Sequence, residues 1–177
     1  MGGCSISKRS ITIKPALLII DVQKEFYKSS PQTAHSLKDA VEYINAAIAL
    51  FRAKGLPVVA IQQVDEEEGV VPGKEGFELP AELQVLPTDL HIHKIYGNAF
   101  NKTALEKELR KLGVDTVILT GFCAEQCVLS TYRGAQDLDL TPILLRGSLA
   151  SGVMENIRFV ESINDIMSYG ALKKILE

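Results

Sequence analysis

Short apolar runs alternate with longer amphipathic stretches along most of this chain. The largely apolar runs lie at 16–20, 58–61, 116–120 and 141–145. Runs of this length are typical of strands that are buried on both faces. Between Leu37 and Lys54 the apolar positions recur at helical spacing, and Gly55 follows as a helix end. The same criteria predict further helices at 103–112, 124–138, 153–162 and 171–176, and short strands at 91–94 and 165–167.

This alternation predicts the fold class. Apolar strands separated by helices imply right-handed crossovers and a parallel sheet with helices on both faces. We therefore expect an α/β chain that forms a Rossmann-like three-layer α/β/α sandwich with a parallel sheet of about six strands. Residues 15–177 are expected to form one domain behind a tail at 1–14, and the acidic loop at 65–87 is long enough to be functional. Ligands of such sheets bind beyond the carboxyl ends of the strands.

Composition excludes several classes of partner. Lys and Arg number 19 against 22 Asp and Glu, a formal charge of −3, so no basic excess exists to neutralise nucleic-acid phosphates. No apolar run approaches the roughly 20 residues of a membrane span, and no secretory signal is expected. Three cysteines do not suggest a disulfide framework, which favours a reducing, cytoplasmic location. Gly2, Gly3 and Cys4 leave lipidation open, although Ile6 occupies the position where the acylation motif has Ser or Thr.

Three reactive side chains come directly after, or at the end of, predicted strands: Asp21, Lys94 and Cys127. Cys127 follows a Gly turn and falls in the first turn of a predicted helix, where the helix dipole and a nearby Lys94 are expected to lower the thiol pKa. Asp21 can accept or return the proton. A lone cysteine is more often a small buried apolar residue, but the joint placement at one sheet edge favours a nucleophile.

Three segments of the chain resemble a known family. They read LLIIDVQKEF at 17–26, HKIYGNAFNKTAL at 93–105 and LTGFCAEQCV at 119–128. In this order they are similar to the isochorismatase-like cysteine hydrolases, a superfamily that includes nicotinamidases, N-carbamoylsarcosine amidohydrolases and isochorismatases. The resemblance extends from about Pro15 to the C-terminus.

The resemblance implies roles for individual residues. Cys127 would attack a carbonyl or amidine-like carbon, Asp21 would handle its proton, and Lys94 would stabilise the charged pair. A cis peptide between Phe122 and Cys123 would aim the backbone N–H groups of Cys123 and Cys127 at the oxyanion. Relatives are commonly oligomeric, so a homo-oligomer that acts on a small molecule is expected. The implied substrate-binding candidates are Phe26, Gln63, Tyr96 and Phe122.

Departures from the family pattern narrow the function. The Asp-x-His metal site of nicotinamidases is missing after the second strand, where the chain has Gln62 and Gln63, so we predict no metal and no cofactor. Glu66–Glu68 is expected to be a solvated loop. The leading prediction is a metal-independent hydrolase of amide or carbamoyl-type C–N bonds. Alternatives are an isochorismatase-type enol-ether hydrolase or a catalytically silent binding protein, and the intact Asp21, Lys94 and Cys127 set disfavours silence.

Overall fold

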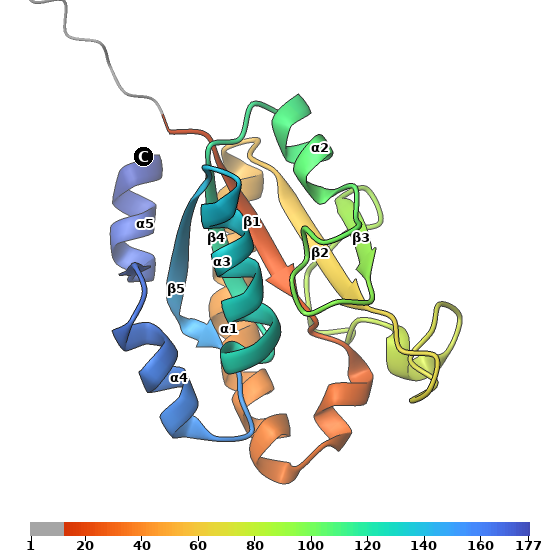
Figure 1. Cartoon of the computed structure of the whole chain (residues 1–177). Helices are drawn as coiled ribbons and strands as arrows, with labels where there is room; N and C mark the ends of the chain where they lie inside the picture. Colours follow the sequence, from red (N-terminus) through yellow and green to blue (C-terminus); the bar gives the residue numbers. More distant parts are fainter. Residues whose placement is uncertain (1–12) are drawn as a thin grey trace, which may run out of the picture.

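The sheet of the computed structural model, which describes residues 13–177, has six strands that all pair in parallel (Figure 1). Their order is β3-β2-β1-β4-β5-β6. This confirms the predicted α/β fold class. The predicted tail at 1–14, including Gly2, Gly3 and Cys4 where lipidation is left open, falls almost wholly on residues 1–12, which lie outside the described residues. The strands are β1 Pro15–Ile20, β2 Val58–Gln63, β3 Leu90–Lys94, β4 Thr116–Gly121, β5 Thr141–Leu149 and β6 Ile166–Met167.

Helices cover both faces of the sheet. Every residue of β1 is buried, because Leu17 and Ile19 pack toward the first of these helix layers and Ala16, Leu18 and Ile20 toward the second. Burial on two faces explains why the strand is apolar without alternation. Figure 1 shows α3 and α1 on opposite sides of the strands. The first layer holds α1 Pro31–Ala53 and α5 Tyr169–Leu176, and the second holds α2 Leu105–Lys111, α3 Leu129–Asp137 and α4 Met154–Ser162.

The largest differences from the predicted helices lie at α1 and α3, and the other helix ends shift by one or two residues. Helix α1 begins at Pro31, six residues before the predicted Leu37. Ser30 caps it by accepting a hydrogen bond from the Thr33 backbone N–H at 3.0 Å, and proline suits the first helical position. The predicted helix at 124–138 is divided, since a π-helical turn η3, Ala124–Val128, precedes α3. Apolar periodicity detects neither feature, because caps and turn types depend on single polar groups and local backbone geometry.

The strand order places a crevice between β1 and β4. The chain runs outward through β2 and β3 on one side of β1 and then crosses to β4 on the other side. Such a reversal opens a ligand crevice at the carboxyl ends of the strands. Here the Phe122 N–H donates to the Ile20 carbonyl at 2.8 Å, and the Asp21 N–H donates to the Ile61 carbonyl at 2.8 Å. The segments that follow β1 and β4 therefore leave the sheet side by side.

Gly121 allows this close approach, and its replacement tests the account of the crevice. Its φ is +105°, and a Cβ would stand 2.1 Å from the Ile20 carbonyl oxygen. We expect Gly121→Ala to lower the free energy of unfolding by at least about 2 kcal/mol. Gly55→Ala is the matched control, because Gly55 also has a positive φ but no atom within 4 Å of the added Cβ; it should cost about 1 kcal/mol. Urea unfolding of both variants would contradict the account if the two losses were equal.

Candidate active site

Asp21 directly follows β1 and lies at the base of the crevice. Its φ is +52°, in the left-handed region that aspartate tolerates better than most residues. The residue is 1% exposed. Its Oδ1 atom has no hydrogen-bond partner among residues 13–177, whereas Oδ2 accepts from Lys94. The buried carboxylate is thus held by one oxygen and keeps an acceptor free at the other.

Lys94 joins the predicted residues into one cluster. It is the last residue of β3 and is 2% exposed. Its Nζ donates to Asp21 Oδ2 at 2.7 Å, to Gln63 Oε1 at 2.6 Å and to Cys127 Sγ at 3.4 Å. These contacts use all three donors of the ammonium, and the carboxylate offsets the cost of burying its charge. The structure therefore brings together all three residues that the sequence placed at strand ends.

The pKa values in this cluster correct one sequence expectation. Burial, reinforced by the Asp21 charge, raises the pKa of Cys127 to about 12 and outweighs the opposing effect of Lys94. The prediction of a lowered thiol pKa is therefore wrong for the resting protein, because burial in the fold dominates. Burial also raises the pKa of Asp21, and Lys94 opposes this shift without cancelling it. A carboxylate with a raised pKa accepts a proton more readily, which suits it to take the Cys127 proton during an attack.

The turn that carries Cys127 is fixed by backbone contacts. The peptide bond between Phe122 and Cys123 is cis, as the family resemblance implied. Beyond it, the Ala124 N–H donates to the Ala150 carbonyl at 2.9 Å, and the Val128 N–H donates to the Cys123 carbonyl at 3.2 Å. Cys123 and Cys127 both line the same cavity. The backbone thus presents the two cysteines to one space beyond the sheet edge.

Glu125 anchors this turn from the outer side, a role that the sequence analysis did not anticipate. Its Oε1 accepts from Ser151 Oγ at 2.9 Å and from Asn156 Nδ2 at 2.6 Å. Although burial alone would raise the pKa of Glu125, hydrogen bonds from Cys123, Asn156 and Ser151 lower it overall. The Ser151 N–H donates in turn to Ser36 Oγ on α1 at 3.1 Å. The link depends on residues far apart in the sequence, so no local pattern reveals it.

A cavity of about 320 Å³ opens over Cys127. Of the predicted substrate-binding candidates, Phe26, Gln63 and Phe122 line it, with the two phenyl ring centroids 5.2 Å apart. Tyr96 lies outside the lining, and its hydroxyl accepts from Lys102 Nζ at 3.1 Å. The full lining consists of Asp21, Phe26, Gln63, Asp65, Gly97, Phe122, Cys123, Gln126, Cys127 and Ser130.

Four lining residues were missed by the sequence analysis: Asp65, Gly97, Gln126 and Ser130. Two of them carry a signal that the spacing rules can detect. Ser130 lies three residues after Cys127, on the same face of a helical segment. Asp65 lies two residues after Gln63, so an extended chain turns both to one side. Gly97 depends on tertiary contact with α3, since a Cβ there would stand 3.4 Å from Ser130 Oγ.

Comparison with known proteins identifies the family. The family model of the isochorismatase domain matches residues 15–158. The chain belongs to the isochorismatase family. YrdC, an isochorismatase family protein of Bacillus subtilis, is 30% identical over 140 residues, which cover 78% of this chain and 74% of YrdC. The match to the family model runs from the start of β1 into α4, and therefore includes Asp21, Lys94 and Cys127.

Two further matches connect this isochorismatase-family chain with hydrolases. Ureidoacrylate amidohydrolase RutB of Pseudomonas savastanoi is 24% identical over 166 residues, which cover 73% of this chain and 68% of RutB. The crystal structure of N-carbamoylsarcosine amidase from Thermoplasma acidophilum superposes with a TM-score of 0.76 at 26% identity, covering 88% of this chain and 96% of that one. The chain is accordingly a hydrolase of the isochorismatase family.

Proposed function

We propose that this hydrolase cleaves an amide or carbamoyl-type C–N bond of a small molecule through a covalent intermediate on Cys127, without a metal. The observation that carries the proposal is the buried cluster in which Lys94 Nζ contacts Asp21 Oδ2 at 2.7 Å and Cys127 Sγ at 3.4 Å at the base of a cavity. A nucleophile, a base and a group that orients both are the elements of covalent catalysis. The names of the amidohydrolase and amidase relatives support the C–N bond as the target.

The proposed reaction begins with attack of Cys127 sulfur on the substrate carbonyl carbon while the thiol proton passes to Asp21. The tetrahedral intermediate carries its negative charge on oxygen, and we assign its stabilisation to the backbone N–H groups of Cys123 and Cys127. Asp21 then returns the proton to the leaving nitrogen as the C–N bond breaks and a thioester forms. Water, deprotonated by Asp21, attacks the thioester, and the acid leaves as the thiol is restored.

Lys94 serves both halves of this sequence. Its ammonium remains beside Asp21 and Cys127 when negative charge moves from the carboxylate to the sulfur and back. Because the site is buried, such a fixed charge acts more strongly than it would in water. Gln63 holds the ammonium from a third side at 2.6 Å, and its own backbone N–H donates to Gln23 Oε1 at 2.7 Å. Gln63 is thereby assigned to positioning Lys94 as well as lining the cavity.

A panel assay tests the proposed function. Primary amides, N-carbamoyl compounds and isochorismate would be supplied to the purified protein with and without EDTA, and ammonia, amine or carbonyl product measured. We expect turnover of at least one C–N substrate that EDTA leaves unchanged. This expectation follows from the cluster, in which the Lys94 ammonium supplies a fixed positive charge beside the proposed base and nucleophile. No group of three or more His, Cys, Asp or Glu side chains suited to a metal occurs within residues 13–177.

Each other outcome contradicts part of the proposal. Turnover of isochorismate alone would identify an enol-ether hydrolase, and binding of a panel member without turnover would identify a silent binding protein. Activity lost to EDTA and restored by one stoichiometric metal would overturn metal independence.

A homo-oligomer and a cytoplasmic location stay predictions. In the described part of the chain no helix is both long enough and apolar enough to cross a bilayer.

A further inference from the structure

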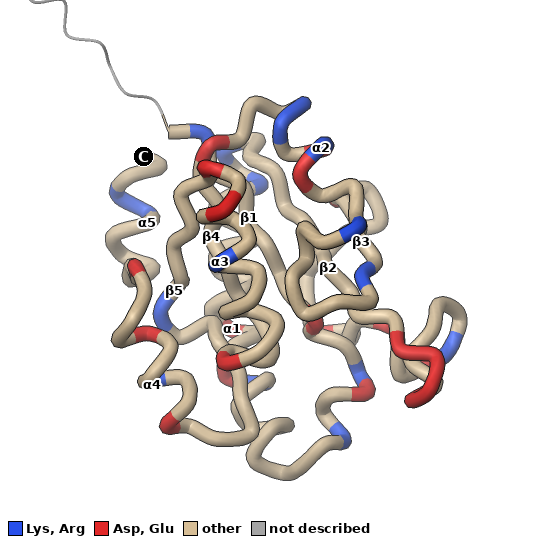
Figure 2. The backbone as a smooth tube through the Cα atoms, in the orientation of Figure 1, with Lys and Arg blue, Asp and Glu red and all other residues tan. Residues whose placement is uncertain are grey.

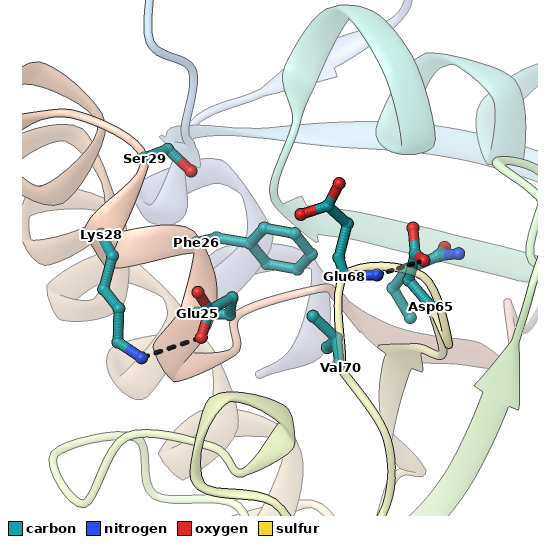
Figure 3. A pocket seen from close by; sticks show the side chains of 8 residues that line it. Glu25, Phe26, Lys28, Ser29, Asp65, Glu68 and Val70 are labelled. Carbon is teal, nitrogen blue, oxygen red and sulfur yellow. Dashed lines mark hydrogen bonds and ion pairs between the residues drawn. The ribbon is translucent and has the colours of Figure 1, made fainter.

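A second cavity of about 300 Å³ adjoins the cavity over Cys127. The two share Phe26, Gln63 and Asp65 in their linings, so a ligand can extend from one into the other. We call the cavity over Cys127 the inner chamber and the second one the outer chamber. Each is of the size of small-molecule sites. The outer chamber is lined by Glu25, Phe26, Lys28, Ser29, Gln63, Asp65, Glu68 and Val70 (Figure 3).

The outer chamber has an excess of negative charge. Its lining holds the carboxylates of Glu25, Asp65 and Glu68 and one cation, Lys28. Lys28 Nζ is paired with Glu25 Oε2 at 2.8 Å, which leaves Asp65 and Glu68 to set the local potential. Both belong to the acidic run at 65–68, and Figure 2 shows acidic residues, in red, on the loop after β2. Glu66–Glu68 are exposed, as expected for a solvated loop, and Glu68 also lines this cavity.

The inner chamber offers no cation to a ligand. Its lining contains no Lys, Arg or His. The nearest ammonium, Lys94, is buried with its donors engaged by Asp21, Gln63 and Cys127. By contrast, Asp21 lines the same chamber, and its buried Oδ1 atom accepts no hydrogen bond from any residue in 13–177. A substrate carboxylate would find no counter-charge here, whereas a group that donates hydrogen bonds would find an acceptor.

The Phe26 side chain lines both chambers. In Figure 3 its ring points from the segment that carries Glu25 toward the loop that carries Asp65 and Glu68. Aromatic faces attract alkylammonium and guanidinium groups, and carboxylates beside the ring add to that attraction. The outer chamber therefore combines an aromatic surface, an apolar wall at Val70 and two carboxylates.

We infer that the substrate carries a positive charge: its scissile carbonyl occupies the inner chamber and an alkylammonium or guanidinium group occupies the outer chamber, against Phe26 and beside Asp65 and Glu68. This inference rests on the proposed function for the reaction itself. It separates this chain from the relative named for ureidoacrylate, because an acrylate carries a carboxylate. Glu68 and Asp65 would act as specificity-determining residues and take no part in bond breaking.

Thiol labelling by reagents of opposite charge tests the charge preference without turnover. The probes are 2-(trimethylammonio)ethyl and 2-sulfonatoethyl methanethiosulfonate, which each form a mixed disulfide with the thiol and release methanesulfinate. Tandem mass spectrometry would follow the adduct on Cys127 separately from Cys123, at low salt. The cation-to-anion rate ratio is divided by the same ratio for 2-mercaptoethanol, so the intrinsic reactivity of the reagents cancels. We expect a normalised ratio of about tenfold or more, as in clefts of one charge sign.

Two matched variants locate the effect. Glu68→Gln removes a charge from the outer chamber, and we expect it to lower the normalised ratio at least about threefold. Glu67→Gln removes the same charge from the neighbouring position, which is as exposed as Glu68 but outside the lining of the chamber. It should change the ratio by less than about 1.5-fold, because solvent and salt screen a charge that does not line the ligand's path. A wild-type ratio at or below one, or equal effects of the two variants, would overturn the inference. If the wild-type protein shows the expected normalised ratio but hydrolyses no panel member, the proposed function is refuted while the preference of the outer chamber for a cation is supported.

Discussion

Replacing Cys127 with alanine should abolish turnover, whereas Cys123→Ala should retain much of it. Both cysteines line the inner chamber. Of the two sulfur atoms, only that of Cys127 accepts a hydrogen bond from Lys94 Nζ among the described residues. Cys123 would contribute its backbone N–H, which alanine retains. Its thiol pKa is also raised to about 12, chiefly by burial and then by Glu125. Glu125 is already held by Ser151 and Asn156 and has a lowered pKa, so it accepts a proton less readily than Asp21, whose pKa is raised.

The measurement is kcat/KM on whichever panel substrate the wild-type protein turns over. Cys127→Ser provides a control of similar shape, and it should be nearly inactive because a hydroxyl is far harder to deprotonate than a thiol. Thermal unfolding of all three variants should show that each is folded at the assay temperature. Loss of activity in Cys123→Ala with full activity in Cys127→Ala would mean that the wrong cysteine has been assigned.

The pair formed by Asp21 and Lys94 should show separate effects on stability and on chemistry. Removing either charge leaves the other buried and uncompensated, so Asp21→Asn and Lys94→Met should each cost about 3 kcal/mol or more of unfolding free energy. Each should also lower kcat/KM by at least about 10²-fold, the lower end for loss of a general acid–base group. In the double variant no buried charge of the pair remains, so most of the stability should return while turnover stays lost.

Urea unfolding and kinetics on the same three proteins decide this prediction. A double variant as unstable as the sum of the single variants would show that the ion pair does not couple the two residues. Recovery of turnover together with stability would show that the pair supports the fold and takes no part in the reaction. Glu75, whose side chain lies 4.0 Å from Lys24 on the exposed surface, offers a control, because Glu75→Gln should change the unfolding free energy by less than about 1 kcal/mol.

The hydrophobic pattern predicted the sheet because burial on two faces leaves a direct mark on the sequence of each strand. The six residues of β1 show this most clearly. The placement of Asp21 and Lys94 followed from the same pattern, since parallel strands bring their carboxyl ends to one edge. Apolar spacing does not reveal the helix start at Ser30 and Pro31, because that start depends on a polar cap and on proline at the first helical position.

Properties that depend on tertiary packing could not be predicted from the sequence. The pKa of Cys127 rises because several elements bury it together, and the sequence showed only the helix and the lysine that act in the opposite direction. Asp65 and Glu68 likewise form part of a cavity only because the loop after β2 folds back toward Phe26. Tyr96 was expected to bind the substrate but does not line the cavity. Its neighbour Gly97 does, and the Tyr96 hydroxyl contacts Lys102 instead.

A trapped covalent adduct tests the central claim most directly. The wild-type protein would be mixed with a C–N substrate from the panel, quenched in acid within the first turnovers, and analysed by tandem mass spectrometry of the peptide that contains both cysteines. The account predicts an added mass equal to the acyl group, located on Cys127 and missing from Asp21→Asn, in which the proton acceptor is removed. An acyl group located on Cys123, or hydrolysis that proceeds at full rate in Cys127→Ala, would contradict it.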